Sequence, residues 1–167
     1  MENSDLRATE EIKVFTDGSF MKTKMGELCG YGINFPNKEY PNVGRPFKHM
    51  PMTNQRAELY AIYKAIKTII ESGSKSKIMI YTDSEYSIKS LTEWAPNWEK
   101  NNWKNSQKKD VMNQDIIKPI YNYLKKRPGR INFKHVRSHT GKLDWESINN
   151  EIADQLATNG AKRMMQK

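Results

Sequence analysis

The fold prediction for this sequence depends most on residues 11–20, EIKVFTDGSF. Ile12 and Val14 alternate with residues of the opposite face, which is the period of a β-strand packed on a core. The strand is predicted to stop at Asp17, because Asp followed by Gly is typical of a turn. Taken alone, the segment favours a turn over a functional site. Asp17 gains importance because acids recur in similar surroundings further along the chain.

The apolar patterns outside this segment predict four more strands and several helices. The strands are expected over residues 28–35, 39–48, 77–82 and 130–136, with the prolines of 39–48 placing that strand at an edge. The helices are expected over residues 53–72, capped by Thr53 or Asn54 and stopped by Gly73, from Ser84 onward, and over residues 110–126 and 150–162. Residues 20–28 and 141–149 are expected to be loops, and Pro96 is expected to interrupt a helical pattern over residues 94–103.

This order of elements predicts the fold class. Three strands with short links favour an antiparallel meander, and the strand–helix–strand units that follow require parallel crossovers. We therefore expect an α/β fold, a mixed five-stranded sheet of an antiparallel meander plus parallel strands, with helices on both sides. The 167 residues suit one domain, expected over residues 11–163, with a flexible N-terminus over 1–10 and a tail over 164–167.

Composition excludes several classes of protein. The sequence has no apolar run near the roughly 20 residues of a membrane span, and its polar, acid-containing start resembles neither a secretory signal nor a transit peptide. The single cysteine, Cys29, excludes an internal disulfide and a cysteine-based zinc site, and it is expected to be a small buried side chain. We expect an intracellular protein, in the cytoplasm or, as an alternative, the nucleus.

The charge balance indicates a polyanionic partner. Lys and Arg number 28 against 19 Asp and Glu, which gives a net charge of +9. Nucleic acid is the first candidate partner. An evenly spread charge that serves solubility is an equal alternative. A membrane surface is a weaker one, because no helical pattern combines a basic face with bulky anchors.

Four acids stand out by their positions. Asp17 and Asp83 each follow a predicted strand, in TDGS and YTDS, while Glu58 lies early in one helix and Asp154 on the last. If the first and fourth strands are parallel neighbours, Asp17 and Asp83 meet at the sheet edge where α/β proteins place their sites. Turn, capping and helix-dipole roles explain the first three acids one at a time, but Asp154 lies among apolar residues and is harder to explain in this way.

Converging carboxylates repel one another unless a cation neutralises them. Oxygen ligands without cysteine select Mg²⁺, or Mn²⁺ as a substitute, over zinc. Two such ions about 4 Å apart activate water and stabilise the leaving oxygen in phosphodiester cleavage. The acids therefore predict a two-ion nuclease site.

The motifs TDGS, TNQRAEL, YTDS, HVRSHTG and NEIADQLA, in this order and near these spacings, resemble the ribonuclease H family, type 1. The resemblance runs from about residue 13 to 161. It implies an endonuclease that cleaves the RNA strand of RNA/DNA hybrids with two Mg²⁺ ions and leaves 5′-phosphate and 3′-hydroxyl ends. It assigns metal binding and catalysis to Asp17, Glu58, Asp83 and Asp154. It also assigns a role in proton movement and product release to His139, whose loop is expected to be long; His135 is expected to be in the core.

The resemblance also marks a basic protrusion at about residues 94–109, where tryptophans interleave with lysines. Basic groups neutralise phosphates and indoles pack on sugars, so Trp94, Trp103 and Lys104 are candidates for binding the DNA strand; an aromatic core beneath a solvated lysine face is the alternative, favoured for Trp98. Further substrate contacts are expected from Thr53 with a phosphate and from Asn54 and Gln55 with the minor groove. Asn150 is expected to contact the water on the metal or the RNA backbone.

Two other functions remain open at this stage. A DNA-cutting relative of the same fold would need no residue that detects the 2′-hydroxyl, and a hybrid-binding module without activity would lack one of the four acids. We expect a monomeric enzyme that stands free, with a segment cut from a larger polyprotein as the alternative.

Overall fold

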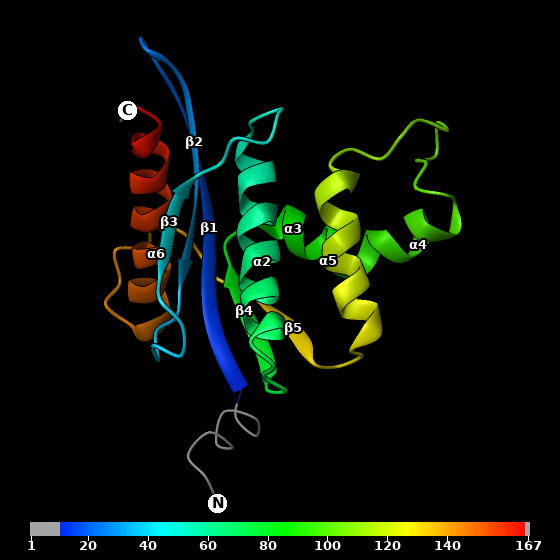
Figure 1. The fold of residues 1–167 in the computed structure, drawn as a ribbon. Helices are drawn as coiled ribbons and strands as arrows, with labels where there is room; N and C mark the ends of the chain where they lie inside the picture. The colour runs from blue at the N-terminus through cyan, green and yellow to red at the C-terminus, as the bar shows by residue number, and fades with distance from the viewer. Residues whose placement is uncertain (1–10, 166–167) are drawn as a thin grey trace, which may run out of the picture.

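The computed structural model, which describes residues 11–165, contains one mixed five-stranded sheet in the order β3-β2-β1-β4-β5 (Figure 1). The strands are β1 (Glu11–Thr23), β2 (Gly26–Asn34), β3 (Val43–Pro46), β4 (Lys77–Thr82) and β5 (Ile131–His135). β1, β2 and β3 pair antiparallel, whereas β1, β4 and β5 pair parallel. The fold class is confirmed, and β3 lies at the sheet edge as predicted. The N-terminus expected to be flexible, residues 1–10, lies outside the described residues.

Helices cover both faces of the sheet. On one side lie α2 (Asn54–Glu71) and, beyond it, α5 (Gln114–Lys126); α6 (Trp145–Lys162) lies on the other (Figure 1). The short helices α3 (Glu85–Lys89), η2 (Ser90–Trp94) and α4 (Ala95–Lys100) lead away from the sheet toward α5. A one-turn helix, η3 (Arg163–Met165), follows α6 in the segment expected to be a tail. Among residues 11–165, no helix is both long and apolar enough to cross a bilayer.

The prediction that the first strand ends at Asp17 is wrong, and so is the loop predicted over residues 20–28. β1 runs on to Thr23, and a short turn at residues 24–25 leads directly into β2. Gly18 serves close packing instead of a turn: a Cβ built there would lie 2.5 Å from the backbone nitrogen of Glu58. Glycine is therefore required at this point because α2 crosses the strand at backbone contact.

Two predicted helix starts are also wrong. The last helix begins at Trp145 and not at residue 150, because Asp144 caps it by accepting a 2.8 Å hydrogen bond from the Ser147 amide. α5 begins at Gln114 and not at residue 110, after Asn113 with φ 64°. Pro96 does not break the helical segment, since it lies in the first turn of α4, where a helix needs no N–H. Helix α2, by contrast, has its predicted cap, with Thr53 accepting from the Arg56 amide at 3.1 Å.

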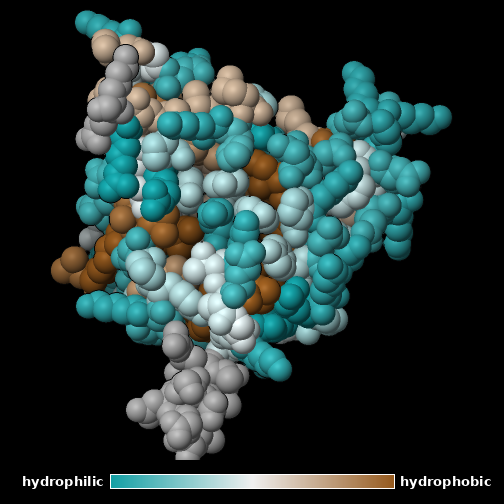
Figure 2. Space-filling view, in the orientation of Figure 1, coloured by the Kyte–Doolittle hydropathy of each residue, from teal (hydrophilic) through white to brown (hydrophobic). Residues whose placement is uncertain are grey.

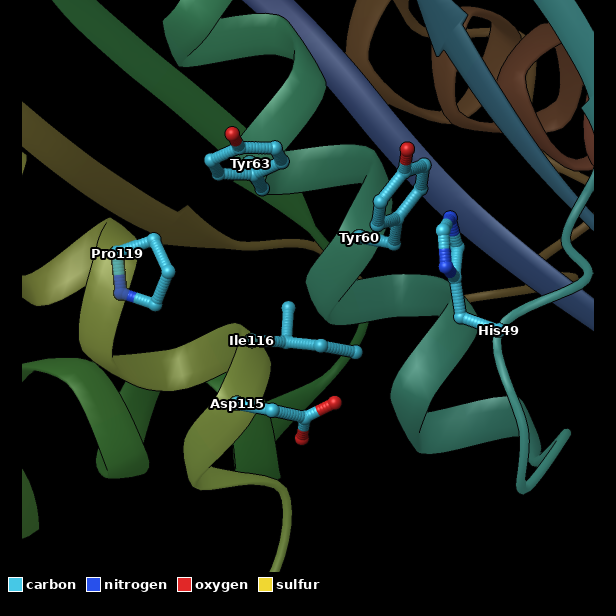
Figure 3. A pocket seen from close by; sticks show the side chains of 6 residues that line it. All are labelled: His49, Tyr60, Tyr63, Asp115, Ile116 and Pro119. Carbon is cyan, nitrogen blue, oxygen red and sulfur yellow. The ribbon is translucent and has the colours of Figure 1, made fainter.

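The seam between α2 and α5 joins the sheet to the outer helices. Aromatic and apolar side chains line a cavity of about 210 Å³ there (Figure 3), formed by His49, Tyr60, Tyr63, Asp115, Ile116 and Pro119. Beside it, the Arg56 guanidinium, only 3% exposed, donates two 2.8 Å hydrogen bonds to the Asp115 carboxylate. A two-pronged pair of this kind fixes orientation as well as distance. It therefore ties α5, and the helices packed on it, to the start of α2.

Candidate active site

Parallel pairing places the first two acids side by side. β1 and β4 pair in register up to Phe15 opposite Tyr81, so Asp17 and Asp83 each stand two residues beyond the last pair. The prediction that the first and fourth strands are parallel neighbours is thus confirmed. Asp17 accepts a 2.9 Å hydrogen bond from the Gly18 amide and is only 3% exposed.

Helix α2 supplies the third acid. Its close crossing over Gly18 brings Glu58, 7% exposed, next to the strand ends. One carboxylate oxygen each from Asp17, Glu58 and Asp83 lies within 4.8 Å of the others. The hydroxyl of Ser84, the cap of α3, donates to the Ser87 hydroxyl at 2.9 Å and lies close enough to Glu58 to lower the pKa of that carboxyl.

Helix α6 brings the fourth acid from the opposite face of the sheet. Asp154 lies within hydrogen-bonding reach of Asp17, and Asn150, one turn earlier, lies within hydrogen-bonding reach of Asp83. Asp154 also forms a second cluster with His139 and Glu151, in which ligand atoms again lie within 4.8 Å of one another. The structure therefore brings together all four predicted acids, Asn150 and His139.

The electrostatics of the site favour the binding of a cation. Burial, followed by the charges of Asp83 and Glu58, raises the pKa of the Asp17 carboxyl to about 10. Burial, with the Asp83 charge as the next cause, raises the pKa of Glu58 to about 7. Burial also raises the pKa of Asp83, against the lowering effect of the neighbouring Asn150 amide. Without a cation, Asp17 and Glu58 would take up protons near neutral pH.

The residues present fit a divalent metal. The three-acid cluster offers only oxygen donors, the type that Mg²⁺ and Mn²⁺ prefer. Asn150 adds a buried amide oxygen that has no hydrogen-bond partner among the described residues. A buried polar atom without a partner is costly, and a metal or its water would satisfy it.

A cleft of about 500 Å³ opens over the acids. Asn54 and Gln55 line it and are exposed, as expected of groups that contact a substrate, whereas the Thr53 hydroxyl serves as the cap of α2. Glu85 and Ser19 also line the cleft. The sequence did not single out Phe20, Tyr86, Ser138 and Glu151 as site residues. Glu151 could have been found from its spacing, since residues three apart share a helix face.

Two histidines differ from what the sequence predicted. His135 is exposed instead of buried, and its Nε2 lies 3.2 Å from the carbonyl oxygen of Asp83. His139 was expected in a lengthened loop, but the early start of α6 confines that loop to residues 136–144. His139 is exposed at the cleft, with Nδ1 3.7 Å from a Glu151 oxygen.

The protrusion stands beside the cleft on a row of aromatic rings. Successive centroids from Tyr86 through Trp94, Trp98 and Trp103 to Tyr121 are 5.8–6.3 Å apart. Trp94 is 38% exposed, whereas Trp98 and Trp103 are half-buried against the core. Lys104 is exposed and paired with Asp110, and hydrophilic side chains dominate this side of the molecule (Figure 2). Trp94 and Lys104 are thus available to a ligand, while Trp103 also supports the protrusion.

Comparison with known proteins agrees with this geometry. Residues 9–162 match the family model described as RNase H. A probable ribonuclease H of Acanthamoeba polyphaga mimivirus is 38% identical over 98% of this chain and 69% of its own length. The ribonuclease H of Syntrophomonas wolfei is 36% identical over 93% of this chain and 99% of its own length. The solution structure of the PFV RNase H domain superposes with a TM-score of 0.73 at 27% identity, covering 92% of this chain and 96% of that domain.

Proposed function

This chain belongs to the ribonuclease H family of nucleases, which cleave the RNA strand of RNA/DNA hybrids, and we propose that it does so by two-metal-ion hydrolysis at the acid cluster. The products would carry 5′-phosphate and 3′-hydroxyl ends. The observation that carries this proposal is the convergence of three carboxylates within 4.8 Å, with Asp154 within hydrogen-bonding reach of one of them.

Asp17, Glu58, Asp83 and Asp154 would hold the ions, and burial prepares them for this role. The raised pKa values of Asp17, Glu58 and Asp83 indicate that the site disfavours unneutralised negative charge, which favours the binding of a cation. When bound, two divalent ions activate water and stabilise the developing charge on the leaving oxygen. Mg²⁺ is the proposed ion, and Mn²⁺ would substitute.

The remaining polar groups of the site would orient water and substrate. Asn150 lies within hydrogen-bonding reach of Asp83, and its buried amide oxygen, which has no partner among the described residues, would bind a water or an RNA group. His139 lies at the mouth of the cleft, and its imidazole, which can both accept and donate a proton, is suited to moving a proton or assisting product release.

Hybrid recognition would extend from the cleft to the protrusion. Asn54 and Gln55 offer amide donors and acceptors, which are suited to detecting the 2′-hydroxyl. Trp94 and Lys104 would bind the DNA strand, with Trp103 beneath them and Thr53 near a phosphate. Because all these groups come from one chain, we expect a monomer to be active.

A cleavage assay with an end-labelled RNA/DNA hybrid, and matched RNA/RNA and DNA/DNA duplexes, tests the proposal. We expect cutting only of the RNA strand of the hybrid, dependent on Mg²⁺ and abolished by EDTA. Cleavage of the DNA duplex would assign the chain to a DNA-cutting function. Hybrid binding without cutting in either Mg²⁺ or Mn²⁺ would reduce the function to recognition.

A further inference from the structure

His139 holds a backbone conformation that requires support. Its φ of 51° lies in the left-handed region, which is unfavourable for a residue other than glycine. Its side chain is exposed, so burial does not fix the ring. Strained conformations persist where neighbouring contacts hold them.

Hydrogen bonds tie this loop to the first turn of α6. The Thr140 hydroxyl donates to the Ser147 hydroxyl at 3.0 Å and accepts from the Lys142 amide at 3.1 Å. Ser147 in turn donates to Asp144 at 3.1 Å, and its amide donates to the same carboxylate at 2.8 Å. The residue next to His139 is thereby linked to the helix that carries Asp154.

The first turn of α6 is itself fixed on the sheet. The Trp145 ring meets Phe15 and Tyr81 edge-on, with centroids 5.3 and 5.6 Å apart, and the Lys13 ammonium lies 5.4 Å from its centre. Glu146 forms an ion pair with Lys134 of β5. The hydrogen bonds from Thr140 thus end on a rigid support.

We propose that Thr140 and Ser147 position the His139 imidazole over the acid cluster, an inference that rests on the proposed function. Their hydrogen bonds fix the path of the loop. The His139 ring is thereby held with its Nδ1 3.7 Å from a Glu151 carboxylate oxygen and beside Asp154. Thr140 is a positioning residue: its hydroxyl is used within the loop, and its effect on the reaction passes through His139.

A double-mutant cycle tests this role. Thr140→Val removes the hydroxyl at constant shape, Thr140→Ser restores it, and Thr68→Val is the matched control, since that hydroxyl bonds only within α2. We expect Thr140→Val to lower kcat on the hybrid on the order of tenfold, a fraction of the 10²–10⁴-fold that a positioned acid–base group contributes, with KM unchanged. In a His139→Ala background, Thr140→Val should cause no further loss. Thr140→Ser and Thr68→Val should retain wild-type kcat.

The ring signals of His139 in NMR spectra give a second readout that does not depend on activity. We expect Thr140→Val to shift and broaden them and Thr140→Ser to restore them. Unchanged ring signals, an unchanged kcat, or an equal loss of kcat with and without His139 would each overturn the positioning role. A wild-type protein that does not cut the hybrid would refute the proposed function, while the ring signals would still decide whether Thr140 positions His139.

Discussion

Replacement of Gly18 by alanine tests the physical origin of the site. The added methyl would lie 2.5 Å from the Glu58 nitrogen, 2.8 Å from the Ala57 carbonyl carbon and 2.9 Å from the Ala57 Cβ. Two of these atoms belong to the backbone, so no side-chain rotation relieves the clash. Helix α2 must move away from β1, and it carries Glu58 with it.

The size of the movement follows from ordinary contact distances. Nonbonded heavy atoms prefer separations of about 3.5–4.0 Å, so α2 must retreat by roughly 1 Å. Overpacking of this kind typically costs about 1–3 kcal/mol of unfolding free energy, which corresponds to a melting temperature lowered by roughly 3–10 °C in a chain of this length. A misplacement of about 1 Å in a catalytic geometry can cost about 10²-fold in rate. Gly18→Ala should therefore lose far more activity than its stability loss would explain.

Steady-state hybrid cleavage and thermal melting, measured together, separate these effects. Gly160→Ala is the matched control, because its methyl would also meet backbone at 2.5 Å, but at Arg45 on the edge strand β3. We expect the control to keep kcat within about twofold of wild type, with part of its clash offset by the higher helix propensity of alanine. Wild-type activity in a folded Gly18→Ala protein, or equal losses of activity in both variants, would refute the reasoning.

Four further predictions concern charge and substrate binding. In the folded protein the pKa values of Glu58 (about 7) and Asp17 (about 10) lie above the ordinary carboxyl values of 4.5 and 3.8. The two groups therefore add fully to the free energy of unfolding below about pH 4, and this contribution is lost as the pH rises through 7 toward 10. The melting temperature measured in EDTA should show this decline with pH. The decline should be smaller in Asp17→Asn, and excess Mg²⁺ should oppose it most at high pH. Asp83→Asn should abolish cleavage while leaving hybrid affinity, measured by fluorescence anisotropy, within about threefold; full activity would contradict its assignment as a ligand. Lys104→Ala should lower the slope of log affinity against log salt concentration by roughly 0.9, and a slope equal to that of the wild type would show that Lys104 does not contact the hybrid. Trp94→Ala should raise KM with kcat unchanged.

The acids could be predicted because each stands at a point that local pattern determines. The apolar period of residues 77–82 predicts β4 with its observed bounds, and so places Asp83 at a strand end. Thr53 as a cap fixes the start of α2, and with it the position of Glu58 within the first turns. Short-range rules suffice for such elements, since the signals for start, period and stop agree.

The failures have a different cause, because they concern long-range packing. A glycine has two uses, a positive φ or the absence of a Cβ, and the sequence around Gly18 does not say which. Only the position of α2 shows that the second use applies. His135 was misassigned for a similar reason, since strand alternation gives the face of a side chain but not whether another element covers it.

The acids converge from opposite faces of the sheet because two glycines on neighbouring strands each let a helix approach closely, one on each face. Gly18 admits α2 on one face, and Gly32 admits α6 on the other, where a Cβ would lie 2.3 Å from the Ala153 oxygen. Asp17 is the cross-strand partner of Gly32, so the acid of β1 stands where α6 crosses the sheet at backbone contact. The core must overcome the repulsion that results, because these helices are held by apolar burial on either side and not by attraction between their acids. The site is thus assembled against its own electrostatics, which is why a divalent cation, and not a rearrangement of the helices, is the expected means of relieving the repulsion.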